Sequence, residues 1–253
     1  MPNNLMNFNH QVNSEEITQE VTKLRIPAWF LRYPDLLNAL FEVTYFIGKT
    51  DDATSPEGHF YTLGYNTLIQ FPYTIRASSI LLEKGFYFEA IILVRNLYES
   101  FFQLRYFHKH KDAIFGHWTI KKNKVLFKQM FDEIAPGFYQ KIYGEQFSQF
   151  AHSGVSSSMF RTTYSSPEVG ETTMGSNYHE LGCMYTINKI IVILYGALNY
   201  VPILFPLYSS LVTDETEHKR KEALIWLESV MKADIEEKPE IQEFYDLVHP
   251  LIY

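Results

Sequence analysis

The sequence has few of the residues that cross-link or punctuate a chain. It holds one cysteine, Cys183, which excludes an intrachain disulfide and fits a reducing compartment. Its 12 glycines and 11 prolines among 253 residues are too few for the many turns of a sandwich or barrel. Residues 1–10 lack the charged and then apolar pattern of a signal peptide. We therefore expect a cytoplasmic protein built from helices.

Basic charge and cofactor motifs are also scarce. The net charge is −7, so the chain is not built to hold duplex nucleic acid by counterion release alone. The sequence has no glycine-rich phosphate loop, no G-x-S-x-G elbow and no H-E-x-x-H motif. His108 and His110 form an HxH pair that points its rings apart on a helix. We expect neither a metal nor another cofactor.

Apolar residues, in contrast, are abundant. They make up 46% of the chain, with 20 Phe and 18 Tyr, which is enough for a substantial core. The run from Ile190 to Val212 has no charged side chain and is long enough to cross a membrane. However, Asn199, Pro202 and Pro206 interrupt it, and no Lys/Arg cluster follows immediately to fix an orientation. A central buried helix ending near Pro202 is the preferred interpretation, without a membrane span.

Periodicity and capping signals predict an all-α fold, a single helical bundle domain over residues 1–253 with roughly eight to ten helices. Residues 1–12 are expected to be flexible, and residues 60–71 favour no element clearly. Residues 153–176 are rich in Ser and Thr and predict a long loop or a small hairpin. The expected helices cover residues 13–24, starting at an Asn13 cap, 34–47, 72–84, 86–110, 121–135, 143–152, 177–202, 214–232 and a short segment from Pro239.

Two pairs of polar residues stand out on otherwise apolar helices. Arg95 and Glu99 are four residues apart in the most apolar predicted helix, and so are Ser148 and His152 in a later one. If the two helices meet, these side chains form one polar cluster. In it, His152 would titrate near neutral pH and Arg95 would hold an anion such as phosphate. The alternative is a buried network that only fixes helix register. The basic run at residues 218–221 is interpreted as a solvated helix face.

Residues 81–90, Arg95-x-Leu-x-Glu99 and Ser148-x-x-x-His152 resemble an uncharacterised bacterial all-helical family, over a core of about residues 65–200. The helical layout is also distantly similar to HEPN-like bundles. Many of those are metal-independent ribonucleases with an R-x(4–6)-H motif at a dimer interface, and many act in toxin systems or phage defence. Arg105 and His110 fit that spacing literally, although the residue after Arg105 is Tyr rather than a polar one.

The resemblance implies a HEPN-like protein that interacts with RNA or a nucleotide in stress or phage defence, and a possible homodimer. If it is an enzyme, it is a metal-independent ribonuclease whose candidate catalytic residues are Arg95, Glu99, Ser148 and His152, and, with weaker support, Arg105 and His110. The alternative is a non-enzymatic interaction or sensing module in which the polar cluster is structural.

Overall fold

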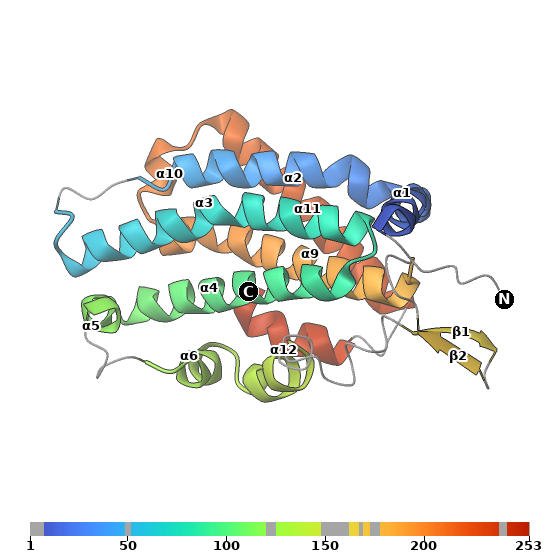
Figure 1. Cartoon of the computed structure of the whole chain (residues 1–253). Coiled ribbons are helices and arrows are strands. Elements are labelled where there is room, and N and C mark those ends of the chain that lie inside the picture. Colours follow the sequence, from blue (N-terminus) through green and yellow to red (C-terminus); the bar gives the residue numbers. More distant parts are fainter. Residues whose placement is uncertain are drawn as a thin grey trace.

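The structure, a computed structural model, describes residues 8–48, 52–119, 125–147, 162–166, 169–172, 178–237 and 242–252. Long helices run side by side along one direction, and shorter helices cover one flank (Figure 1). The described elements are α1 (Phe8–Arg25), α2 (Pro27–Tyr45), α3 (Pro56–Glu83), α4 (Tyr87–Lys109), α5 (Ala113–Thr119), α6 (Phe127–Ile134), the π-helix η2 (Tyr139–Phe147), β1 (Thr162–Ser166), β2 (Val169–Thr172), α9 (Glu180–Leu204), α10 (Tyr208–Leu211), α11 (Asp214–Glu237) and α12 (Gln242–Ile252). The predicted all-α class is confirmed, with eleven helices in the described residues.

The helix α9 lies at the centre of the bundle. It packs against α2, α4, α11 and α12, and Ile190–Leu194 is buried along its whole length. Among the described residues, the segment Gly182–Leu204 is the one helix long and apolar enough to cross a membrane, and most of it is buried inside the bundle. The prediction of a central buried helix is confirmed. Its start differs, because the His179 ring accepts a hydrogen bond from Gly182 N at 3.1 Å and caps the helix there.

The helices α3 and α4 form an antiparallel hairpin in front of α9 (Figure 1). The predicted boundaries of α4 are confirmed to within one residue at each end. The prediction that a helix starts after Pro72 is wrong, because α3 begins at Pro56 and continues through Pro72. Phe71 and Ile75 are buried on either side of that proline, so tertiary packing offsets the lost backbone hydrogen bond.

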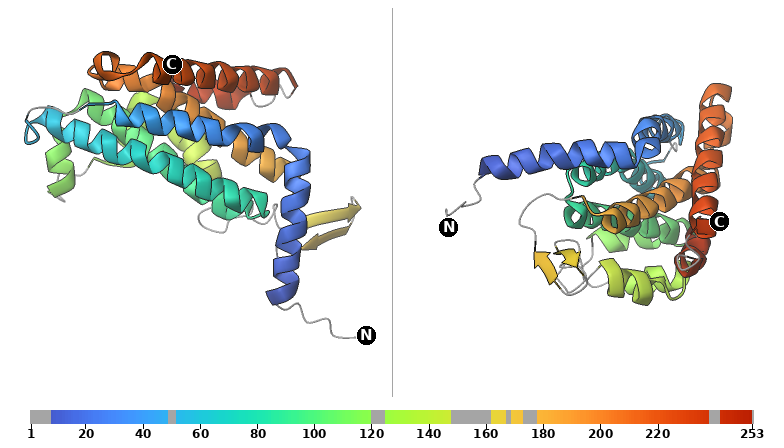
Figure 2. Two further views of the ribbon diagram at one scale, coloured as in Figure 1. Left: turned by 90° about the horizontal axis from the view of Figure 1, so that it is seen from above. Right: turned by 90° about the vertical axis from the view of Figure 1, so that its right-hand side faces the viewer.

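The first two helices depart from prediction in similar ways. Asn13 lies inside α1 rather than at its cap, and residues 8–12, expected to be flexible, are helical. The face of α1 that packs on the bundle carries Thr18 and Thr22, whereas Ile17 and Leu24 are exposed. In both views of Figure 2, α1 extends away from the long helices. The buried face of α1 is therefore polar, and the spacing of its apolar residues does not predict which side packs on the bundle.

The prediction that a helix starts at Pro34 is also wrong. The helix begins at Pro27, which occupies the first helical position, and Pro34 lies inside it. Of the two alternatives for residues 153–176, a long loop or a small hairpin, the described residues form a hairpin, the antiparallel pair β1–β2 with Thr162 opposite Thr172. It projects from the same end of the bundle as α1 (Figure 1).

Candidate functional site

The helix α4 brings Arg95 and Glu99 together as the sequence spacing predicts. Arg95 Nε donates to Glu99 Oε1 at 2.7 Å. The two side chains are 20% and 19% exposed, so the pair lies at the edge of the core, neither sealed nor fully solvated. A pair in this position is stronger than a surface ion pair, because water screens it less.

A third residue, Tyr143 of η2, completes what we call the α4 cluster, defined as Arg95, Glu99 and Tyr143. The Tyr143 hydroxyl donates to Glu99 Oε1 at 2.6 Å and accepts from Arg95 Nη2. The guanidinium carbon also lies 4.6 Å from the centre of the Tyr143 ring. Two helices that are 44 residues apart in sequence at this point are therefore joined by one shared carboxylate oxygen.

The cluster shifts the ionisation of its own members. Burial raises the pKa of Tyr143 to about 12, and the hydrogen bond to the Glu99 carboxylate adds to the shift. Burial lowers the pKa of Arg95, but the hydrogen bonds and charges of Glu99 and Tyr143 outweigh it and raise that pKa overall. Near neutral pH, Arg95 is a cation and Tyr143 is a neutral phenol that can donate.

Aromatic packing positions η2 against α4. Gly137 has φ of +86°, a left-handed conformation that turns the chain after α6 into η2. Phe138 and Phe147 then pack on Tyr98, with ring centres 5.7 and 5.2 Å apart. Tyr98 directly precedes Glu99 in α4. These ring contacts therefore hold η2 where the Tyr143 hydroxyl can reach the Glu99 carboxylate. π-Helical turns are rare and are often found at functional sites.

Ser148 and His152, predicted to join Arg95 and Glu99, lie outside the described residues. Their part in the cluster stays a prediction. The described stretch 125–147 ends at Phe147, which directly precedes Ser148 and whose side chain is fully buried. The segment that carries Ser148 and His152 thus starts one residue from a position fixed against α4.

The weaker pair, Arg105 and His110, does not converge. The Arg105 guanidinium stacks 3.5 Å from the centre of the Tyr200 ring and donates to the Pro250 carbonyl, on the side of α9 and α12. His110 instead lies 2.9 Å from a Glu133 carboxylate oxygen, on the side of α6. His110 follows the last residue of α4, and each of the two side chains has its partner on a different neighbouring element.

Metal and thiol chemistry find little support among the described residues. Within them, no group of three or more His, Cys, Asp or Glu side chains could hold a metal ion. Cys183 is completely buried, and burial raises the pKa of its thiol to about 12. A thiol in that environment stays protonated and packs as a small apolar side chain.

A second cluster of the same three residue types was not predicted from the sequence, and we call it the α11 cluster: Tyr208, Glu217 and Arg220. Arg220 binds Glu217 through two nitrogens, both at 2.8 Å, and its third nitrogen donates to the Leu198 carbonyl at 2.9 Å. The Tyr208 hydroxyl donates to the same carboxylate at 3.0 Å. The prediction that residues 218–221 form a solvated face is wrong for Arg220, which is 9% exposed.

Lys189 is another buried charge that spacing alone did not reveal. It lies on α9 with 4% exposure, and its ammonium nitrogen is 3.0 Å from the centre of the Phe244 ring. Burial holds its pKa well below the usual value for lysine. The aromatic faces of Phe244 and Tyr185 are its nearest ring contacts, so it fastens α12 to α9 rather than facing a site.

A comparison with known families gives one match. The model of a family of unknown function (DUF5677) matches residues 73–133, a stretch that begins within α3 and ends in α6. It includes Arg95, Glu99, Arg105 and His110, but not Tyr143. The expected similarity to an uncharacterised family is therefore supported over this stretch, which is shorter than residues 65–200. Neither the curated proteins nor the solved structures gave a match.

Proposed function

We propose that this protein is a non-enzymatic interaction or sensing module in which the α4 cluster holds η2 against α4. The observation that supports this is the commitment of Arg95. Its guanidinium already donates to Glu99 and Tyr143, and the Glu99 carboxylate neutralises its charge. A guanidinium used in this way attracts a phosphate far less than one with no carboxylate beside it.

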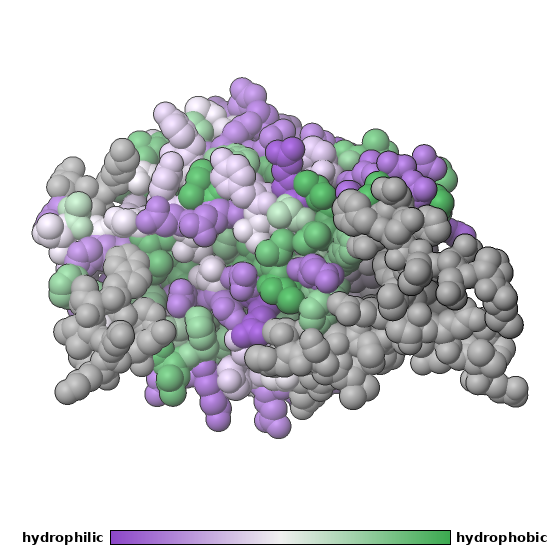
Figure 3. Space-filling model, in the orientation of Figure 1, coloured by the Kyte–Doolittle hydropathy of each residue, from purple (hydrophilic) through white to green (hydrophobic). Residues whose placement is uncertain are grey.

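The apolar surface of the molecule fits the same proposal. Large side chains are exposed on several helices, among them Tyr73 and Ile80 on α3. Figure 3 shows apolar side chains gathered near the middle of the face formed by α3 and α4. Contiguous apolar surface of this kind is typical of regions that contact a partner, and a second copy of the chain is one such partner.

A second candidate is the HEPN-like, RNA- or nucleotide-interacting protein of stress or phage defence, acting in the cytoplasm. It is favoured by the position of Phe147, which is fully buried against Tyr98 and directly precedes Ser148 in the sequence. In that case His152 would exchange the proton and Arg95 would neutralise the phosphate, without a metal.

Cleavage of single-stranded RNA in EDTA separates the two candidates. Purified protein, recovered without detergent, would be incubated with RNAs of varied sequence, alongside the variants Arg95→Ala and His152→Ala. The module predicts intact RNA in every tube. The ribonuclease predicts EDTA-resistant cleavage that falls by about 100-fold or more in the His152 variant. That result would overturn the module.

The pair Arg105 and His110 supplies the internal control. Because these side chains point to different neighbours, His110→Ala should leave any cleavage unchanged. Loss of cleavage in His110→Ala but not in His152→Ala would instead assign the activity to the literal R-x(4)-H spacing.

A further inference from the structure

The helix α1 turns a polar side towards its own bundle. Thr18 and Thr22 are buried, and Gln19 donates to the Glu83 carboxylate of α3 at 2.6 Å. Lys23 adds an ion pair to the same carboxylate oxygen at 3.4 Å. These contacts between α1 and the bundle are polar.

The opposite side of α1 carries an apolar stripe, which we call the α1 stripe: Ile17, Val21 and Leu24. At about 100° per residue these three lie within about 60° of one another, and roughly opposite the side that faces α3. Ile17 is 64% exposed and Leu24 is 81% exposed, with Val21 half-buried between them. The helix is therefore amphipathic, and its apolar face points away from its own bundle.

The α1 stripe differs from ordinary exposed apolar residues. Apolar side chains scattered singly are common on protein surfaces. Here the side chains share one face, at the spacing with which one helix packs against another. In both views of Figure 2, α1 extends away from the long helices, so these helices do not block the approach of a partner.

The charges beside the α1 stripe favour a protein partner over a lipid surface. Glu16 and Glu20 are exposed along one edge of the stripe, and Arg25 is exposed at the other. The whole chain has a net charge of −7. Helices that lie on a membrane are instead rich in Lys and Arg beside their apolar face. A second helix is therefore the better partner.

The spacing fits a parallel pair of α1 helices from two copies of the chain. With Val21 at position a of a heptad, Ile17 and Leu24 take position d, and Val at a with Leu at d favours two parallel strands. Glu20 then takes position g and Arg25 the next position e, which lie beside each other across a parallel seam. Within the described residues neither of the two forms an ion pair. Glu20 of each copy can therefore pair with Arg25 of the other.

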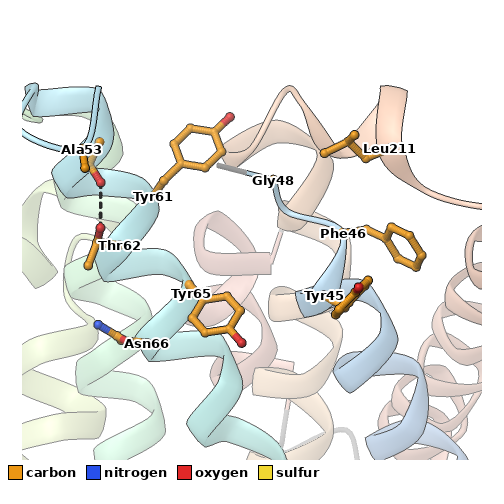
Figure 4. Close-up of a pocket in the computed structure, with 10 residues that line it drawn as sticks. Tyr45, Phe46, Gly48, Ala53, Tyr61, Thr62, Tyr65, Asn66 and Leu211 are labelled. Atoms are coloured by element: carbon orange, nitrogen blue, oxygen red, sulfur yellow. Dashed lines mark hydrogen bonds between the residues drawn. The ribbon is translucent and has the colours of Figure 1, made fainter. Parts of the chain in front are cut away.

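Two other arrangements of copies are less favourable. An antiparallel pair centred on Val21 would bring Glu20 of each copy beside Glu20 of the other, and like charges repel. Alternatively, the stripe could enter a cleft of about 760 Å³ at the other end of α2, where Figure 4 shows Tyr45 on α2 and Tyr65 on α3. Such a head-to-tail contact does not close and builds filaments, whereas a pair of α1 helices closes with a two-fold axis.

We propose that the α1 stripe is a dimerisation surface, on which α1 of a second copy packs in parallel. The two bundles then lie on the outer sides of the pair, because each α1 faces its own bundle on the side opposite the stripe. One helix pair buries less than the roughly 1,200–2,000 Å² of a standard interface, so the dissociation constant should be on the order of 10 µM or weaker. This surface goes beyond the proposed function, since such a dimer is compatible with the interaction module and with the ribonuclease.

Sedimentation equilibrium of the full chain, at concentrations up to a few hundred micromolar, should show monomer and dimer. Ile17→Glu places a charge in the seam and should weaken the dimer about 10-fold or more. Ile225→Glu is the matched control, because Ile225 of α11 is an isoleucine with 68% exposure, and it should leave the equilibrium unchanged. Circular dichroism should show both variants folded. The proposal is overturned by a monomer at every concentration, by equal effects of the two variants, or by filaments that Tyr65→Ala dissolves.

A charge exchange tests the parallel pairing. Glu20→Arg should weaken the dimer, because two like charges then meet across the seam. Adding Arg25→Glu restores opposite charges and should restore the dimer. No recovery in the double variant would contradict this pairing.

Cysteine cross-linking tests the orientation directly. Cys183 is the one cysteine of the chain and is completely buried, so Leu24→Cys adds a single accessible thiol. Mild oxidation should link two copies through it, whereas Ile225→Cys should give no link. A link that forms only when Leu24→Cys is mixed with Ile17→Cys would show an antiparallel pair and overturn the proposal.

Vesicles of phosphatidylcholine and phosphatidylglycerol test the lipid alternative. The full chain should stay in solution when the vesicles are sedimented. Co-sedimentation that Ile17→Glu abolishes would assign the stripe to a lipid surface and overturn the proposal. RNA cleavage in EDTA depends on other residues, so the dimer and the proposed function can fail separately.

Discussion

The α4 cluster and the α11 cluster contain the same three residue types in different surroundings. In the α11 cluster, Arg220 holds Glu217 with two hydrogen bonds and uses its remaining nitrogen on the Leu198 carbonyl of α9. In the α4 cluster, Arg95 makes one hydrogen bond to Glu99 and one to Tyr143. The Arg220 side chain is 11% exposed and the Arg95 side chain 20%.

The difference shows what each cluster does for the fold. Arg220 is tied to the backbone of the central helix, so its loss would leave the Leu198 carbonyl without this hydrogen bond and take two from Glu217. Arg95 joins α4 to Tyr143 of η2, and its side chain is 20% exposed to water. The α11 cluster is therefore a fixed part of the core, whereas the α4 cluster can rearrange at a smaller cost in free energy.

Arg220→Ala should give the largest effect. Removing the guanidinium takes two charged hydrogen bonds from Glu217 and one from the Leu198 carbonyl, and should lower the free energy of unfolding by roughly 3 kcal/mol. Chemical denaturation measures it. Lys221→Ala is the control, because Lys221 also faces Glu217 but is 63% exposed, and its loss should cost less than about 1 kcal/mol. Equal effects for the two variants would mean that burial does not distinguish them.

Glu99→Ala should give a smaller loss, about 2 kcal/mol, because a charged hydrogen bond is removed from a site that water can still reach. A double-mutant cycle with Arg95→Ala isolates the coupling between the two side chains. A coupling free energy as large as that between Glu217 and Arg220 would contradict the smaller contribution to stability expected of the α4 cluster. No loss at all would mean that the pair does not contribute to stability.

Tyr143→Phe should have the smallest effect, about 1 kcal/mol at neutral pH, because only one hydroxyl is lost. Its pH dependence is more informative. The pKa of Tyr143 is raised from an ordinary value of 10.0 to about 12, so the folded state favours the neutral phenol. That stabilisation is complete below pH 10 and is lost as the pH rises towards 12. Wild-type stability should therefore fall more steeply than that of Tyr143→Phe across this range. Parallel curves would exclude the shift.

Much of the fold follows from local signals in the sequence. The uninterrupted apolar run of α4, bounded by Gly85 and His110, predicts its ends to within one residue. The same local reasoning fails at Pro34 and Pro72, where it places helix starts inside continuous helices. A proline costs a helix a few kcal/mol, and buried neighbours such as Phe71 and Ile75 can offset that amount. Local propensity cannot include this packing term.

The candidate site residues also divide into those predicted by local spacing and those placed by helix packing. Sequence spacing alone predicts that Arg95 and Glu99 share a helix face, because residues four apart lie on the same side of a helix. It also determined a helical protein with a buried segment after Ile190, because hydrophobic burial needs only composition and period. The packing of the helices, in contrast, brings Tyr143 to this pair and turns Arg220 inward. These contacts join residues of different helices, and their partners are chosen by how the helices pack, which no local pattern encodes.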